Sequence, residues 1–285
     1  MSSRRAQPAR KQQQTRKPPA RKPVAGTPQW VMPAAAVIAI AALVAAFLIY
    51  RWYTTPLPPP PPSQDTVAQV LATITTLPVS EFDAVGQGTA NNLIKPISGT
   101  ALTGTGGKPV VFYYGAEYCP YCAAERWPII IALSRFGTFT GLTTTTSSST
   151  DVFPNTETFT FHGASYTSQY IEFQSVETTD RNQNPLQSPT PAQQQLVSKY
   201  DSGSGIPFVD FANKFAFNGA TYSPQVINGE SWLAIANALK SPDSTEAKAI
   251  LGSANLITAA VCKSLGDSPS VCSSTTIQNL EKNLK

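Results

Sequence analysis

The sequence predicts an α/β domain, with a central mixed sheet flanked by helices, that follows one transmembrane helix. The helix is predicted by residues 30–50, a run without a charged side chain. The domain is predicted by residues 66–285, in which apolar strand-like runs alternate with segments of helical spacing. Within this domain, the apolar run at residues 110–115 leads to the motif Cys119-Pro-Tyr-Cys122, where a helix is expected to begin.

Residues 1–29 form a basic tail. They contain eight Lys and Arg residues and no Asp or Glu, and their Pro, Gln and Ser residues leave no apolar periodicity, so we expect a disordered segment. A basic tail can bind nucleic acid or anionic lipid. Residues 52–285, however, have a net charge of −5, so the overall positive charge predicts no nucleic-acid partner for the domain.

The apolar run at residues 30–50 is long enough to cross a hydrocarbon core of roughly 30 Å. Trp30 marks one end, and Tyr50 and Trp52 mark the other, as aromatic residues do at membrane interfaces. The positive-inside rule then predicts a single-pass protein of the cell membrane, with a cytoplasmic N-terminus and an extracytoplasmic domain. A cleaved signal peptide is the alternative, although its apolar region would be shorter, roughly 7–15 residues.

A proline-rich linker, residues 51–65, follows the apolar run. Its prolines predict a polyproline II helix that acts as a stiff spacer and holds the domain about 20 Å from the membrane. A ligand for a proline-binding domain is the alternative. We favour the spacer because the linker should face outward, whereas most such adaptor domains work in the cytoplasm.

Periodicity and breaker residues predict the elements of the domain. Helices are expected over residues 66–77, 192–200, 232–239 and 244–265, and strands over 110–115, 141–145, 156–161, 170–176, 205–211 and 215–217. The helix after the cysteine motif should end at Gly137, and Pro128 should kink or break it. Residues 143–150 are all Thr and Ser and predict an exposed loop. The strand at 156–161 alternates and should be half-buried, and Asn218-Gly219 should supply a hairpin turn.

Cys119 and Cys122 have the spacing and context of a thiol–disulfide exchange site. The N-terminus of a helix carries partial positive charge and free N–H groups, which favour a thiolate at Cys119. Cys122 lies one turn further on the same face, so it can close a disulfide with Cys119 or resolve a mixed disulfide. A zinc site and an inert disulfide are the alternatives. Zinc usually needs about four ligands in two close pairs, which this chain lacks, so we predict no metal and no cofactor.

Two further cysteines, Cys262 and Cys272, lie near the end of the chain. Outside the membrane, where disulfides persist, they predict a structural disulfide that joins the end of one helix to the start of the next. Closing this loop would stabilise the domain by about 2–3 kcal/mol. A second redox pair that relays electrons to the first is the alternative. His162, the single histidine, predicts a strand-end or turn residue without a catalytic role.

Taken together, these motifs resemble those of the thioredoxin superfamily. The segment from Ala116 to Cys122 after a hydrophobic strand is similar to the active-site entry of thioredoxins, and its Cys-Pro-Tyr-Cys motif is similar to that of glutaredoxins. The segments 114–128, 133–139 and 148–156 more specifically resemble a thioredoxin-like domain-of-unknown-function family of single-span membrane proteins. The resemblance covers most of residues 66–280. It implies a thioredoxin-like fold with insertions, a cis peptide at Ile206-Pro207 facing the cysteines, and a redox role without an established substrate.

The resemblance also assigns roles to residues around the cysteines. It implies catalytic roles for Cys119, Cys122 and Pro207, and we expect substrate positioning by Tyr118, Pro120, Tyr121 and Ile206. Tyr113 stands where thioredoxins carry a buried aspartate that moves protons from the second cysteine. Glu125 is a possible substitute in proton relay, although we favour a solvated or salt-bridged surface role.

Two functions follow from these motifs. The first is a membrane-anchored, extracytoplasmic thiol–disulfide oxidoreductase that acts on cysteines of envelope or secreted proteins and is recycled by a membrane redox partner. The second is a non-catalytic envelope protein in which Cys119 and Cys122 form an inert disulfide and the Ser/Thr-rich face binds a partner. Because oxidase, reductase and isomerase share these residues, the sequence leaves the direction of the reaction open.

Overall fold

A computed structural model describes residues 31–54, 61–201, 203, 205–266 and 269–284. The predicted basic tail and most of the proline-rich linker therefore lie outside the described residues. The chain divides into two units, residues 1–54 and residues 55–285. The first contains one described helix, and the second contains the mixed α/β domain.

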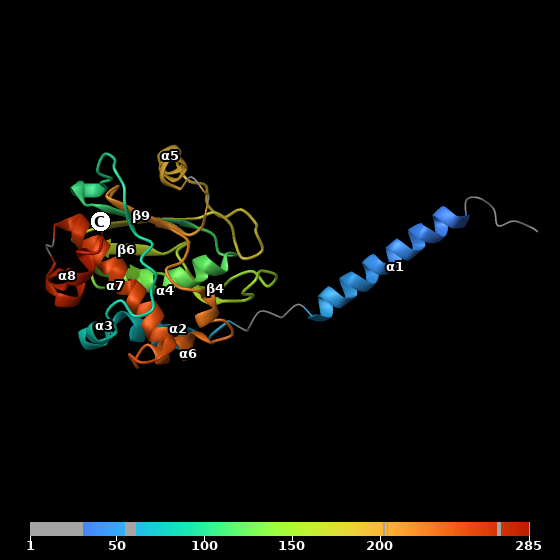
Figure 1. Ribbon diagram of the computed structural model, residues 1–285, viewed down its shortest axis with the longest axis horizontal. Helices are drawn as coiled ribbons and strands as arrows, with labels where there is room; N and C mark the ends of the chain where they lie inside the picture. Colours follow the sequence, from blue (N-terminus) through green and yellow to red (C-terminus); the bar gives the residue numbers. More distant parts are fainter. Residues whose placement is uncertain (1–30, 55–60, 202, 204, 267–268, 285) are drawn as a thin grey trace, which may run out of the picture. The chain divides into compact units, whose positions relative to one another are not determined.

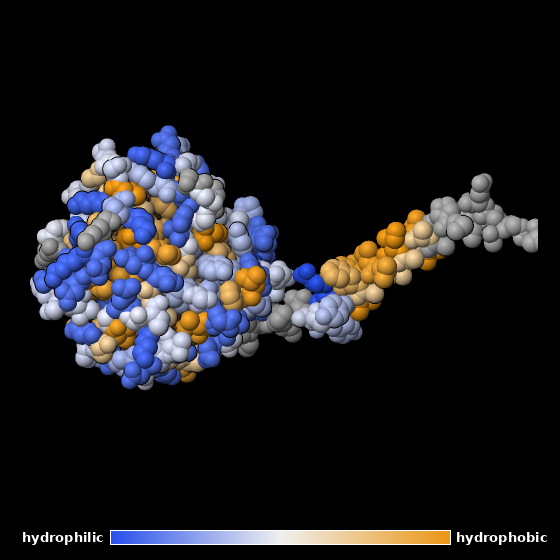
Figure 2. Space-filling view, in the orientation of Figure 1, coloured by the Kyte–Doolittle hydropathy of each residue, from blue (hydrophilic) through white to orange (hydrophobic). Residues whose placement is uncertain are grey.

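The described part of the first unit is helix α1, Val31–Thr54, which begins where the apolar run was predicted and extends past it to Thr54. From Ala36 to Thr54 the helix is long and apolar enough to span a membrane. The large apolar side chains between Val37 and Tyr53 are exposed. Figure 2 colours much of this helix as hydrophobic. An exposed apolar helix of this length is consistent with a single membrane anchor.

A five-stranded mixed sheet forms the centre of the second unit (Figure 1). In spatial order the strands are β1 (Lys95–Pro96), β9 (Phe215–Asn218), β8 (Phe208–Phe211), β2 (Val110–Gly115) and β7 (Glu172–Glu177). Strands β2 and β7 are parallel, whereas β2 with β8, β8 with β9 and β9 with β1 are antiparallel. The predicted mixed sheet is confirmed, and β2, which leads to the cysteines, lies inside it between β8 and β7.

Helices pack around this sheet. They are α2 (Gln64–Thr75), α3 (Val79–Val85), α4 (Pro120–Ser134), α5 (Pro191–Tyr200), α6 (Trp232–Ala238), α7 (Thr245–Leu265) and α8 (Thr275–Glu281), with short 3-10 turns η1 (Thr105–Gly107), η2 (Pro224–Val226) and η3 (Ser270–Ser273). The four helices predicted outside the cysteine segment are confirmed within a few residues. Helix α7 packs against α4 and α8, as Figure 1 also shows.

Two apolar clusters form the core. Alternate side chains of β2 enter different clusters, because successive side chains of a strand point to opposite faces of the sheet. Val111 and Tyr113 join the larger cluster with α4 and α7, while Val110 and Phe112 join the smaller one with Val197 of α5. The sheet is thus covered on both faces, and this burial explains the almost continuous apolar sequence of β2.

Two additional two-stranded sheets lie outside the central one. They pair β3 (Gly137–Thr140) with β6 (Ser165–Ser168), and β4 (Thr143–Thr146) with β5 (Glu157–Thr160). Two predictions here are wrong. The strand predicted at 141–145 belongs to the β4–β5 sheet and not to the central sheet, and β5 is buried on both faces.

The Thr/Ser run at 143–150 is also not the exposed loop that was predicted. Its first four residues form β4, and Thr146 at the end of this strand is buried together with Ser147 and Ser148. The Ser147 hydroxyl donates to the carbonyl oxygen of Phe153 at 2.9 Å and accepts from the N–H of Thr156 at 2.9 Å. Internal hydrogen bonds of this kind allow hydroxyl side chains to be buried.

The turn between β8 and β9 is not the predicted Asn218-Gly219. The hairpin itself is confirmed, but Ala212 and Asn213 make its turn, with φ of 56° and 57°. The N–H of Lys214 donates to the carbonyl oxygen of Phe211 at 2.9 Å across it. Two successive residues with positive φ are the conformation of a type I′ turn, which matches the twist of hairpin strands.

Pro128 does not break α4, which continues from Pro120 to Ser134. A proline inside a helix removes the N–H that would bond to the carbonyl four residues earlier, here that of Ala124. The Tyr222 hydroxyl donates to this carbonyl oxygen at 2.8 Å. The freed acceptor is therefore satisfied by a side chain, and the helix continues.

Candidate functional site

Cys119 is the N-cap residue of α4, directly after the loop that follows β2. Its Sγ accepts a hydrogen bond from the N–H of Cys122 at 3.4 Å, which occupies one of the free donors of the first helical turn. Pro120 follows at the first helical position, where the missing N–H has no cost. The side chain of Cys119 is 6% exposed, whereas that of Cys122 is fully buried.

The two thiols differ in acidity. The pKa of Cys119 lies below its ordinary value because the Cys122 thiol bonds to it, with further contributions from backbone N–H groups and from Arg126. Burial raises the pKa of Cys122 well above its ordinary value, and the neighbouring Cys119 sulfur raises it further. This asymmetry is what a nucleophile and a resolving thiol require.

The predicted cis peptide is present between Ile206 and Pro207, at the start of β8. The Cys119 thiol donates to the carbonyl oxygen of Ile206, with a sulfur–oxygen distance of 3.7 Å. On the other side, the carbonyl oxygen of Pro207 accepts from the N–H of Gly219 at 2.8 Å. The loop that contains Pro207 thus faces Cys119 and is anchored by the residue after β9.

Arg126 and Glu177 form a buried ion pair beside the two cysteines. Arg126 lies one helical turn after Cys122, and Glu177 is the last residue of β7. Both side chains are fully buried, and the guanidinium donates to both carboxylate oxygens, at 2.8 and 2.7 Å. A second bond from Nη2, 2.8 Å long, reaches the carbonyl oxygen of Ala116 in the loop before Cys119.

Tyr113 extends this buried group from the central strand β2. Its ring lies 5.8 Å from the Arg126 guanidinium carbon, in cation–π geometry. Its hydroxyl lies beside the Cys122 thiol, and burial raises its pKa well above the ordinary value. A neutral phenol thus lies beside the second cysteine, at the position that the sequence resemblance matched to a buried aspartate.

Sequence reasoning singled out Tyr113 but missed Arg126 and Glu177. The i, i+4 spacing of Cys122 and Arg126 could have suggested that they lie on one helix face. Nothing in the sequence links either residue to Glu177, because that contact depends on the parallel pairing of β2 with β7.

The surface role that we favoured for Glu125 is wrong. Its side chain is fully buried, and its carboxylate accepts bonds from the N–H of Thr221 at 2.7 Å and from the Thr221 hydroxyl at 2.8 and 3.0 Å. Burial raises the pKa of Glu125 to about 8. The helical pattern could not reveal this, since α4 is buried on nearly every face.

The segment between β4 and β5 contacts the residues around the cysteine motif. The N–H of Ser148 donates to the carbonyl oxygen of Tyr118 at 2.8 Å, and the Tyr121 ring meets Phe153 edge to face at 6.1 Å. Tyr121 remains 41% exposed. Among the residues expected to position a substrate, Tyr118, Tyr121 and Ile206 line this region at least partly exposed, whereas Pro120 is buried.

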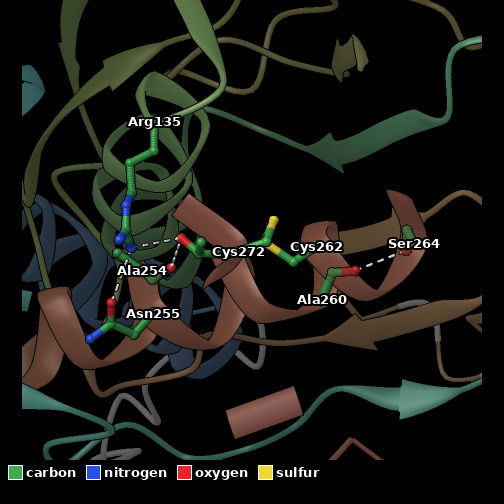
Figure 3. The surroundings of a disulfide bond; sticks show 8 residues. Arg135, Ala254, Asn255, Ala260, Cys262, Ser264 and Cys272 are labelled. Atoms are coloured by element: carbon green, nitrogen blue, oxygen red, sulfur yellow. Dashed lines mark hydrogen bonds between the residues drawn. A yellow bond between two sulfur atoms is a disulfide. The ribbon is translucent and has the colours of Figure 1, made fainter. Parts of the chain in front are cut away.

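Cys262 and Cys272 form a disulfide between α7 and η3, with their Cα atoms 5.5 Å apart (Figure 3). Both are fully buried. One and two turns earlier in α7, Thr258 and Asn255 each accept a 3.2 Å bond from Arg135. Among the described residues, no group of three or more His, Cys, Asp or Glu side chains could hold a metal ion.

Comparison with known proteins gives one match. A family model described as a domain of unknown function (DUF929) matches residues 96–263, more than half of the chain. No curated protein and no solved structure matches the chain. The matched residues include Cys119, Cys122, the Ile206-Pro207 peptide and the buried Arg126–Glu177 pair.

Proposed function

We propose that this chain, which belongs to the family described as a domain of unknown function (DUF929), is a membrane-anchored, extracytoplasmic thiol–disulfide oxidoreductase with a thioredoxin-like fold. One observation carries the proposal. Cys119 is a helix N-cap whose thiol faces the carbonyl oxygen next to a cis-proline, while its partner Cys122 is buried behind it. Both cysteines are buried, but Cys119 keeps 6% of its surface exposed whereas Cys122 keeps none, so a substrate would react with Cys119 and Cys122 would resolve the mixed disulfide.

The reaction with a substrate disulfide has two steps. The Cys119 thiolate attacks one substrate sulfur, so that a mixed disulfide forms and the other substrate sulfur leaves as a thiolate. The Cys122 thiol then loses its proton, and its sulfur attacks Cys119. The Cys119–Cys122 disulfide forms, and the second substrate sulfur leaves. The reverse sequence oxidises two substrate thiols and reduces Cys119–Cys122.

The thioredoxin-like assignment is supported by the order of elements around the cysteines. Strand β2 is inside the sheet, leads to the motif and pairs antiparallel with β8, whose first residues follow the cis-proline. These are the features that the resemblance of the motifs implies. Cysteine-containing proteins are the substrates, and a membrane redox partner that exchanges disulfides with Cys119 would recycle the site.

The extracytoplasmic location rests on α1 and the basic tail. The helix from Ala36 to Thr54 can span a membrane, and residues 1–29 supply positive charge on its N-terminal side. A reporter fused after Lys285 should be active outside the cytoplasm, and protease added to intact cells should remove the domain. Protection of the domain from protease, together with cytoplasmic reporter activity, would contradict the location.

A trapping experiment tests the oxidoreductase function. In Cys122→Ala the resolving thiol is absent, so mixed disulfides between Cys119 and substrate proteins should accumulate on a non-reducing gel. Adding Pro207→Thr should slow substrate release and increase the trapped amount. The matched control is the Cys119→Ala variant, which should trap nothing.

The same experiment separates the two candidate functions. If the full chain is reduced reversibly at Cys119 and Cys122, and the traps capture cysteine-containing envelope proteins, the enzyme function is supported. If neither variant captures any protein although Cys119 is reducible, the binding-protein function is favoured over the oxidoreductase function.

A further inference from the structure

The buried Arg126 guanidinium is incompletely paired. Its Nε and Nη2 are bonded to Glu177 and Ala116, but Nη1 has no hydrogen-bond partner among the described residues. A buried donor without a partner loses its hydration without compensation, which costs on the order of 1–3 kcal/mol and more for a charged group. Such a donor in a native fold requires an explanation.

The groups around this guanidinium restrict which side chains its charge can act on. Tyr113 lies under it from β2, Glu177 binds it from β7, and the two cysteines lie before it on the N-terminal side of α4. Burial alone would lower the pKa of Arg126, but the Glu177 carboxylate outweighs that effect, so the guanidinium stays charged. The charge acts to lower the pKa of both thiols, although burial still leaves the pKa of Cys122 above its ordinary value.

We infer that Arg126 is a positioning residue for the dithiol, whose incompletely paired guanidinium holds the loop before Cys119 and favours the negative charge of the reduced pair, and that this bias makes the Cys119–Cys122 disulfide an electron acceptor. This inference rests on the proposed function and adds the direction of the reaction to it. When this disulfide is reduced, the negative charge appears on Cys119, whose pKa is lowered, so a fixed cation nearby favours the reduced form. A pair that is stabilised when reduced is a stronger oxidant.

The balanced reaction is oxidation of a substrate dithiol. A substrate thiolate attacks Cys119, a mixed disulfide forms, and Cys122 leaves as a thiolate that takes up a proton because burial raises its pKa. The second substrate thiolate then attacks the mixed disulfide, forming the substrate disulfide and releasing Cys119. Two electrons pass from the substrate to the protein, and a disulfide-bearing partner reoxidises the site in a further exchange.

The test compares reduction potentials of the full chain in detergent, equilibrated with reduced and oxidised glutathione. The alkylation state of Cys119 and Cys122 is read by mass spectrometry, so the buried Cys262–Cys272 disulfide does not interfere. One variant replaces the whole ion pair, Arg126→Met with Glu177→Met, because removing Arg126 alone would leave a buried carboxylate uncompensated. The other, Glu177→Gln, keeps the guanidinium and removes the negative charge opposite it.

The two variants should change the equilibrium in opposite directions. Loss of the pair should stabilise the Cys119–Cys122 disulfide about tenfold, equivalent to a potential about 30 mV lower, and should slow release of Cys122 from the Cys119–Cys122 disulfide. Glu177→Gln should destabilise the disulfide, because the cation is then less neutralised. A structural role alone would move both variants in the same direction or leave both potentials unchanged.

The outcomes also separate this inference from the proposed function. If the wild-type pair exchanges with glutathione but neither variant changes its potential, Arg126 does not act on the dithiol, and the oxidoreductase function stands. If the wild-type pair does not exchange at all, the proposed function fails. Circular dichroism would show whether the double substitution prevents folding. In that case the Glu177→Gln variant decides alone. A lowered or unchanged potential in Glu177→Gln overturns the inference.

Discussion

The hydroxyl of Tyr222 donates a 2.8 Å hydrogen bond to the carbonyl oxygen of Ala124, the acceptor that Pro128 leaves without its helical partner. Tyr222 follows the β8–β9 hairpin, so this bond connects the segment after the hairpin to the helix that carries the cysteines. Because Ala124 lies only two residues after Cys122, the contact supports the first turns of α4, where the dithiol is placed.

We expect Tyr222→Phe to destabilise the domain by about 1–3 kcal/mol, because the buried carbonyl of Ala124 would lose its partner while apolar packing is kept. Urea unfolding followed by circular dichroism measures the change. Tyr170→Phe is the matched control at a 38% exposed site and should have little effect. Equal stability of the Tyr222→Phe variant and wild type would show that the bond does not support α4.

The position of Tyr222 illustrates which parts of the fold the sequence could predict. Local patterns predicted α5, α6, α7 and the strands β2 and β7, because their apolar periodicity reflects the face that each buries. Pro128 was expected to interrupt α4 because local rules do not include a hydroxyl that arrives from a residue far along the chain. The same is true of Ala212 and Asn213, which adopt positive φ at the turn although Asn218-Gly219 has the stronger local signal.

The candidate site likewise has a part that the sequence could predict and a part that it could not. Cys119, Cys122 and the Ile206-Pro207 peptide could be predicted because each belongs to a short motif with a known context. The environment of these residues could not. Burial of Glu125 and the Arg126–Glu177 pair depends on how α4 packs between the sheet and α7, which no spacing in the sequence specifies.

The asymmetry of the two thiols predicts their order of reaction. After reduction, alkylation at neutral pH should modify Cys119 about tenfold or more faster than Cys122, because the pKa of Cys119 is lowered and that of Cys122 is raised. Mass spectrometry of the modified peptides measures both rates. The urea-unfolded chain is the control and should show similar rates. Preferential modification of Cys122 in the folded chain would falsify the assignment of the nucleophile.

The Cys262–Cys272 disulfide should act as a structural crosslink. Replacing both cysteines by alanine should lower the free energy of unfolding by about 2–3 kcal/mol, because the unfolded chain gains the entropy of an open loop. The potential of Cys119–Cys122 should stay unchanged, since the crosslink lies between α7 and η3. A changed potential in this variant would instead favour the electron relay considered from the sequence.

The buried Glu125 predicts how stability depends on pH. Its folded-state pKa of about 8 lies above the ordinary value of 4.5, so between these values the folded chain holds a proton that the unfolded chain has released. Stability is therefore highest below pH 4.5 for this group and falls as the pH rises through about 8, by on the order of 5 kcal/mol in total.

Glu125→Gln removes this titration while keeping an oxygen that can accept a hydrogen bond from Thr221. Urea unfolding between pH 5 and pH 9 should therefore show a shallower loss of stability in the variant than in wild type. Some loss remains, because burial also raises the pKa of Glu157 and Asp210 to about 7. Glu230→Gln, at an exposed site, is the control and should keep the wild-type slope. An unchanged slope in Glu125→Gln would mean that this carboxyl titrates at its ordinary pKa in the folded protein, and so is not held neutral by its burial.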